Sequence, residues 1–122
     1  MKLISFKHGG KNTFGAVVGD KVIDLQSAFA GRATDLKSLI AADLVAEASA
    51  FAKTATPTLA LAALELLPVI PNPGKIVCVG LNYGEHVRET GREITESPAL
   101  FLRVSESQVG HGQDIIRPPE ST

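Results

Sequence analysis

The stretch that decides the fold is Pro71–Tyr83, which reads PNPGKIVCVGLNY. Residues 68–74 contain three prolines, which cannot continue a helix, so this segment predicts an extended linker. The apolar run within Lys75–Val79 is typical of a buried strand. We therefore predict a boundary here, with a small N-terminal α+β domain over residues 1–70 and the beginning of a second domain over residues 71–122.

Upstream of the boundary, residues 2–25 predict a small antiparallel β-meander, because three apolar runs alternate with turn formers. The pair Gly19-Asp20 suits a tight hairpin turn between the second and third runs. Thr56-Pro57 is typical of the start of a short second helix, which follows a longer first one. That first helix is predicted because six apolar residues share one face of a 3.6-residue period: Leu36, Leu39, Ile40, Leu44, Ala48 and Phe51.

Downstream of the boundary, Ala99–Leu102 and Ile115-Ile116 predict two further strands. Between the strand at Lys75–Val79 and the first of these, a short helix is expected. Asn82 is suited to cap it, and Gly91 is placed to end it. The whole chain therefore predicts an α+β fold, a β-meander and helices followed by strands and one short helix.

On that short helix His86 and Glu89 are three residues apart and share a face. A carboxylate beside an imidazole fixes its tautomer, raises its pKa and makes it a better general base. Spacing alone leaves two interpretations open, since the same pattern is also common for a solvated pair on a surface.

The formal net charge of −1 gives no electrostatic reason to expect nucleic acid or an anionic membrane as partner. The single cysteine, Cys78, excludes an intrachain disulfide and fits the cytoplasm. Since it lies in an apolar run, we expect a buried, inert thiol and not a nucleophile. His8 and His111 lie in glycine-rich segments without the spacing of a zinc site.

The sequence Pro71–Tyr83, followed by His86-x-x-Glu89, resembles the signature of the fumarylacetoacetate hydrolase family. The resemblance continues in Pro98–Arg103, Val109–Gly112 and Ile115–Pro118. It implies that the second domain opens a catalytic β-roll, which would be truncated in this chain. It also implies a metal-dependent enzyme that cleaves carbon–carbon bonds of 1,3-dicarbonyl or acylpyruvate-type substrates.

Carried over by motif position, His86 would activate water as general base and Glu89 would be its partner. Arg103 and Tyr83 would contact the substrate, a small dicarboxylate or 2-oxo acid. For Arg103 a charge at a strand end, and for Tyr83 a packing role, remain equally open from the residues alone.

The resemblance also implies a divalent cation, Mg²⁺, Mn²⁺ or Ca²⁺, in the complete enzyme. Its ligands would be a Glu-x-Glu pair and a later Asp, which we expect beyond Thr122. No metal is therefore expected on this chain, and the chain by itself is expected to be inactive. A homodimer is implied for the complete enzyme.

Two alternatives remain. Isomerases and decarboxylases of the same family, acting on hydroxymuconate-type or oxaloacetate-type acids, share these motifs. A non-catalytic module that binds a partner or dimerises would use His86 and Glu89 only as surface residues.

Overall fold

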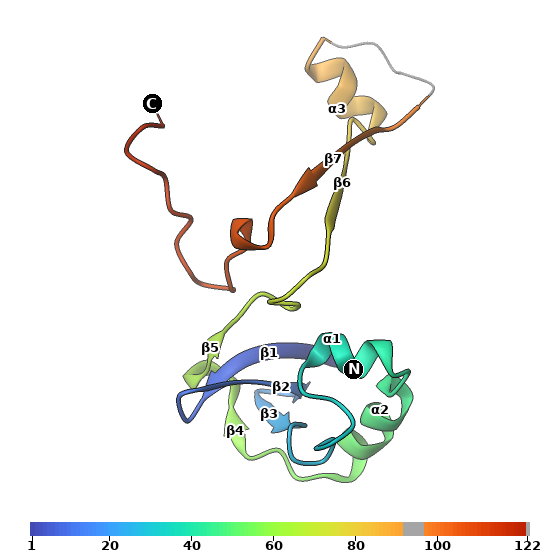
Figure 1. The fold of residues 1–122 in the computed structure, drawn as a ribbon, viewed down its shortest axis with the longest axis vertical. Helices are drawn as coiled ribbons and strands as arrows, with labels where there is room; N and C mark the ends of the chain where they lie inside the picture. Colours follow the sequence, from blue (N-terminus) through green and yellow to red (C-terminus); the bar gives the residue numbers. More distant parts are fainter. Residues whose placement is uncertain (92–96, 122) are drawn as a thin grey trace. The chain divides into compact units, whose positions relative to one another are not determined.

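The computed structural model describes residues 1–91 and 97–121, apart from the side chain of His86. The chain divides into two compact units (Figure 1). The first consists of Met1–Asn72 together with Gln108–Thr122, and the second is Pro73–Ser107.

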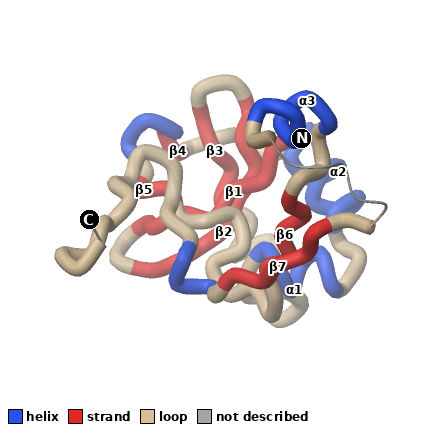
Figure 2. The backbone as a smooth tube through the Cα atoms, turned by 90° about the horizontal axis from the view of Figure 1, so that it is seen from above, coloured by secondary structure: helices blue, strands red, loops and turns tan. Residues whose placement is uncertain are grey.

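The first unit is built on a curled antiparallel sheet (Figure 2). Its centre is the predicted meander over residues 2–25, which is confirmed. Gly19 has φ of +62° and Val18 faces Lys21, the arrangement of a two-residue hairpin turn. The strand order is β4-β3-β2-β1-β5, with β1 at Lys2–His8, β2 at Lys11–Val18, β3 at Lys21–Asp24, β4 at Leu59–Ala60 and β5 at Glu65–Leu66.

The first predicted helix is two helices, α1 at Leu36–Ala41 and α2 at Val45–Thr54. The chain turns between them at Asp43, whose φ is +57°. A single straight helix would run past this small sheet, whereas the turn brings both helices back onto it. Both helices accordingly contribute to the core, α1 with Leu36 and Leu39 and α2 with Ala48. The other core residues come from the strands and the segment before α1, namely Phe14, Ala16, Ile23, Leu25, Phe29 and Ala33.

The second predicted helix, at Thr56-Pro57, is wrong. β4 pairs with β3 and β5 pairs with β1, and a 3₁₀ turn, η1 at Leu61–Ala63, joins them. Backbone pairing at the two open sheet edges outweighs the helix propensity of this Ala/Leu-rich segment. In the register, Leu59 lies opposite Val22 and Leu66 opposite Phe6, and both of these partners are fully buried.

The segment that begins at Gln108 packs against the end of β5. Gln113 Nε2 donates to Glu65 Oε1 at 3.5 Å, and Gln108 Nε2 donates to the carbonyl of Ile70, shortly after β5, at 3.3 Å. The strand predicted at Ile115-Ile116 is wrong, because these residues pair with no described strand and are each 86% exposed.

The second unit is a hairpin of β6, Ile76–Gly80, and β7, Ala99–Arg103, with α3 at Gly84–Glu89 and a 3₁₀ turn η2 at Ser105–Ser107. Both predicted strands form. The burial predicted for the first of them is wrong, since Val77 is 57% and Val79 is 51% exposed. Burial depends on the layers that cover a strand, and an apolar run does not specify those layers.

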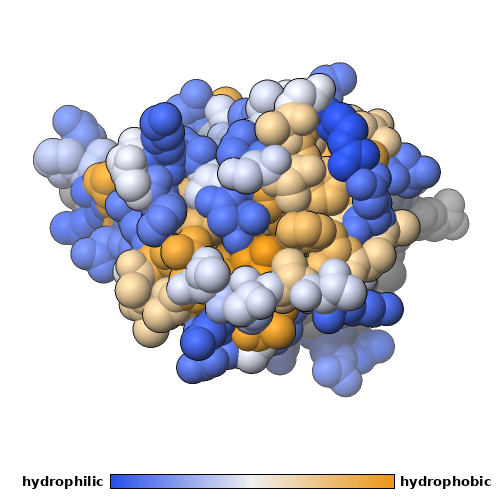
Figure 3. All heavy atoms as spheres, turned by 90° about the horizontal axis from the view of Figure 1, so that it is seen from below, coloured by the Kyte–Doolittle hydropathy of each residue, from blue (hydrophilic) through white to orange (hydrophobic). Residues whose placement is uncertain are grey.

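Apolar atoms also reach the surface elsewhere. Figure 3 shows one face of the molecule on which hydrophobic patches lie among hydrophilic residues. Exposed apolar surface is common on folded proteins, so these patches do not by themselves mark a site.

We expect Gly110→Ala to destabilise the first unit, because a Cβ there would overlap the backbone carbonyl of Leu66. The free energy of unfolding should fall by about 1–3 kcal/mol, and amide exchange near Leu66 should accelerate. Gly74→Ala is the matched control, since a Cβ at Gly74 meets nothing within 4 Å. Equal stability of the two variants in chemical denaturation would contradict the packing described here.

A second prediction concerns Asp35, which caps α1. Its carboxylate accepts hydrogen bonds from the Ser38 N–H at 2.7 Å and from Asn72 Nδ2 at 2.9 Å, and the pKa of Asp35 is lowered, mainly by the first. Asp35→Ala, which removes this cap, should cost about 1 kcal/mol of unfolding free energy at pH 7.

Because the folded pKa is depressed, this contribution is complete above the ordinary aspartate value of about 4. It is lost as the pH falls through the lower pKa of the folded state. Denaturation of the original protein and the variant at pH 7 and at pH 2–3 should therefore give a difference that shrinks in acid. A difference independent of pH would show that the charge of Asp35 contributes nothing.

Candidate functional site

The candidate site begins where the chain leaves β6. Gly80 is the last strand residue, and Leu81 then adopts φ of +55° before α3 starts at Gly84. A leucine rarely adopts this left-handed backbone, which costs on the order of 1 kcal/mol and persists only where the surroundings enforce it. Sequence reasoning missed this feature, because glycine or asparagine is the usual signal for a left-handed residue.

A single apolar side chain anchors α3. Val87 is 1% exposed and is the one buried side chain among those described in this helix. Its N–H donates to the Tyr83 carbonyl at 3.0 Å, and Thr90 Oγ1 donates to the Val87 carbonyl at 2.9 Å. The helix is followed by Gly91, whose φ is +66° and whose N–H donates to the Arg88 carbonyl.

The predicted residues Tyr83, His86 and Glu89 lie in or next to α3. Tyr83 directly precedes the helix and is 74% exposed, and Glu89 is exposed at its end. Position 86 belongs to the helix, but the side chain of His86 lies outside the described residues. On an α-helix positions 86 and 89 share a side, and this side differs from that of the anchored Val87. A contact between the two side chains stays a prediction.

The structure does not bring Arg103 to this helix. In the hairpin Arg103 faces Ile76, whereas Gly80, which leads into α3, faces Ala99. Four residues of strand separate the two ends, roughly 13 Å at 3.3 Å per residue. The Arg103 guanidinium donates to the Ser107 carbonyl at 2.9 Å instead.

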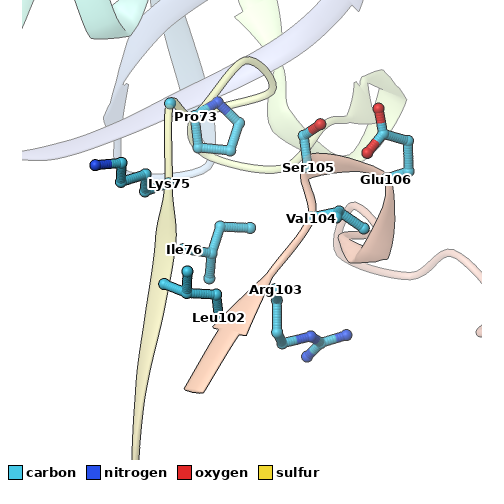
Figure 4. Close-up of a pocket in the computed structure, with 9 residues that line it drawn as sticks. Pro73, Lys75, Ile76, Leu102, Arg103, Val104, Ser105 and Glu106 are labelled. Carbon is cyan, nitrogen blue, oxygen red and sulfur yellow. The ribbon is translucent and has the colours of Figure 1, made fainter. Parts of the chain in front are cut away.

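A hollow of about 350 Å³ lies at the Arg103 end of the hairpin. Figure 4 shows that the charged ends of Lys75 and Arg103 point away from one another. The two cations therefore do not form a clamp for one anion. The hollow is lined by Pro73, Gly74, Lys75, Ile76, Leu102, Arg103, Val104, Ser105 and Glu106.

The described residues do not fit a metal ion. No group of three or more His, Cys, Asp or Glu side chains that could hold one is present in residues 1–91 and 97–121, the side chain of His86 aside. Cys78 is half-buried in β6. His111 lies in a turn of the first unit, beside a hollow lined by Leu61, Leu64 and Leu66. Among the helices that the structure describes, none is long and apolar enough to span a membrane.

Comparison with known families matches residues 75–122 to the model described as "Fumarylacetoacetate (FAA) hydrolase C-terminal". The match begins directly before β6 and contains α3 and β7. Curated relatives match part of the chain at moderate identity. The bovine mitochondrial protein named oxaloacetate tautomerase FAHD2A is 37% identical over 68 residues, 56% of this chain and 22% of its own length.

Two further relatives show the same pattern. The rat mitochondrial oxaloacetate tautomerase Fahd2a is 42% identical over 55 residues, 45% of this chain and 18% of its own length. An uncharacterized protein of Archaeoglobus fulgidus is 41% identical over 58 residues, 48% of this chain and 23% of its own length. The chain thus spans about a fifth of the length of the curated relatives that it matches.

Among solved structures, a Mycobacterium smegmatis protein described as HpcE has a similar fold, with a TM-score of 0.73 and 23% sequence identity. The likeness covers 97% of this chain and 41% of that chain. At this identity it shows the fold alone, a mixed α/β arrangement with a curled antiparallel sheet.

Proposed function

Because residues 75–122 place this chain in the fumarylacetoacetate hydrolase family, we propose that it supplies His86 and Glu89 to the active site of an enzyme acting on a small 2-oxo acid or 1,3-dicarbonyl compound. The observation that supports this most is the position of both residues on α3, inside the matched segment. Members of the family are enzymes, which weighs against a purely structural module.

In the proposed chemistry His86 is the general base and Glu89 orients its imidazole. A hydrogen between two carbonyl groups is acidic, so a neutral imidazole can accept a proton from such a substrate at neutral pH. In tautomerisation the enol O–H loses its proton and the neighbouring carbon gains one. In hydrolysis the same base takes a proton from water, whose oxygen attacks the keto carbon. The bond from that carbon to its neighbour then breaks, and the neighbouring carbon takes up the proton as the enolate leaves.

Tautomerisation or isomerisation is the reaction that we favour, because two mitochondrial relatives at 37% and 42% identity are named oxaloacetate tautomerases. Hydrolysis of a carbon–carbon bond, the reaction predicted from the resemblance, is the second candidate. Decarboxylation would differ from both by releasing CO₂. The mitochondrial names of these relatives leave a cytoplasmic location, like the homodimer, as a prediction.

Enzymes of this family generally use divalent metals, but the described residues contain no cluster that fits one. We therefore assign no step to a metal on this chain, and we propose that its oxygen ligands belong to sequence outside it. Tyr83, next to α3, is proposed to line the substrate pocket.

The general-base assignment predicts that His86→Ala, in the full-length protein, lowers kcat by at least about 10²-fold. Glu89→Gln should lower it by about tenfold, since the imidazole loses its orienting charge. The enol-to-keto absorbance change of oxaloacetate and the cleavage of an acylpyruvate, followed in parallel, decide which reaction is catalysed.

Two variants serve as controls for this experiment. His8→Ala removes a histidine from the first unit, and Arg88→Gln changes a charged residue on the opposite side of α3. Both should leave kcat within about twofold of the original protein. A His86→Ala enzyme with more than a tenth of the original kcat on both substrates would overturn the assignment.

The role of Arg103 needs a separate test, because it lies at the far end of the hairpin from α3. If Arg103 binds the substrate carboxylate, Arg103→Met should raise KM about tenfold with kcat little changed. Lys75→Met, which alters the other cation of the same hollow, is the matched control. An unchanged KM in Arg103→Met would limit the substrate contacts of this unit to the segment around α3.

A further inference from the structure

In the described part of the second unit, Leu81 is the non-glycine residue with a positive φ, a backbone conformation that leucine disfavours. Among the described non-glycine residues, Leu81 and Asp43 have positive φ, +55° and +57°. Aspartate adopts this conformation readily, because its short polar side chain tolerates it. Leucine has no such preference, so a local cause must hold Leu81 there.

We propose that Leu81 is a positioning residue, whose left-handed backbone sets the direction in which α3 leaves β6 and so aims the side of α3 that carries positions 86 and 89. This inference rests on the proposed function, since it concerns how those two residues are held. Leu81 itself touches no reacting atom in this proposal.

The shortness of the connection is the first reason. Only Leu81, Asn82 and Tyr83 separate the end of β6 from the start of α3. A change of φ at Leu81 from the left-handed to the ordinary region turns everything that follows by more than 100°. No longer loop is present to absorb such a rotation before the helix begins.

The weak anchoring of α3 is the second reason. The helix has six residues, and Val87 is the one buried side chain among those described in it. One apolar contact fixes the position of a short helix but leaves its direction free to pivot. The turn at Leu81, whose side chain is half-buried, provides a second fixed point. Together with the contact at Val87 it sets the direction of the helix.

Together the two points explain why leucine is present where glycine would fit without strain. Glycine would permit the left-handed turn but also many other turns, so the helix would sample several directions. A half-buried leucine can favour a single turn. Strained residues of this kind persist where the surrounding structure enforces them, and they gather at functional sites.

The test uses three variants of Leu81 in the full-length protein, assayed with the substrate that the His86 experiment identifies. Leu81→Asn tolerates the left-handed backbone and should keep kcat within about threefold. Leu81→Gly should lower kcat about tenfold with KM within about twofold and no fall in melting temperature, because the turn loosens without strain. Leu81→Val should lower kcat by about 10²-fold, because a branched side chain excludes the turn and misplaces the base.

Asp43 provides the matched control, as it has the same backbone conformation in the first unit. Asp43→Asn and Asp43→Val should leave kcat per folded molecule unchanged, even where Asp43→Val lowers the melting temperature. The split between kcat and KM separates positioning from a general loss of stability, which would reduce only the amount of active enzyme.

If Leu81→Val does not fold, the comparison of Leu81→Gly with Leu81→Asn decides. A Leu81→Gly enzyme with the original kcat would overturn the proposal, as would a Leu81→Val enzyme whose only change is a lower melting temperature. Should His86→Ala also remain active, the proposed function itself would be wrong. Loss of activity in His86→Ala with fully active Leu81 variants would remove only the positioning role.

Discussion

The register of the β1–β2 hairpin is the constraint on which the first unit depends. Lys2 faces Val17 and His8 faces Lys11, so Phe14 lies on the side of the helices and Phe6 on the other side of the sheet. A slip of one residue would exchange the two faces. Gly15 is needed for this arrangement, because a Cβ there would meet the Ile23 carbonyl and the Phe6 ring.

The features predictable from sequence were those that local pattern determines. The meander, the Gly19-Asp20 turn and the two strands of the second unit follow from short apolar runs and turn formers. The predictions were wrong where the structure of a segment depends on residues that are distant in the sequence. Leu59–Leu66 has a composition typical of a helix, yet it forms β4 and β5, which pair with β3 and β1. The sequence of this segment alone does not indicate these partner strands.

The same division holds at the candidate site. The sequence places His86 and Glu89 three apart, which is enough to put both positions on one side of a helix. It contains no signal for the left-handed Leu81, because that conformation is imposed on a residue that does not favour it. Nor does it show that Arg103 faces Ile76, which separates this cation from α3 and depends on the pairing register.

Fold and chemistry are therefore separate questions in this chain. A protein with 23% identity shares the fold, so the fold alone cannot select between tautomerisation and hydrolysis. Both proposed reactions would use the same base, and they differ in whether its proton comes from the substrate or from water. Glu89 is exposed in this chain, and an ion pair in water contributes under about 1 kcal/mol. The base proposed at position 86 would therefore need other residues to cover α3 in the full-length protein, because its pairing with Glu89 strengthens only away from water.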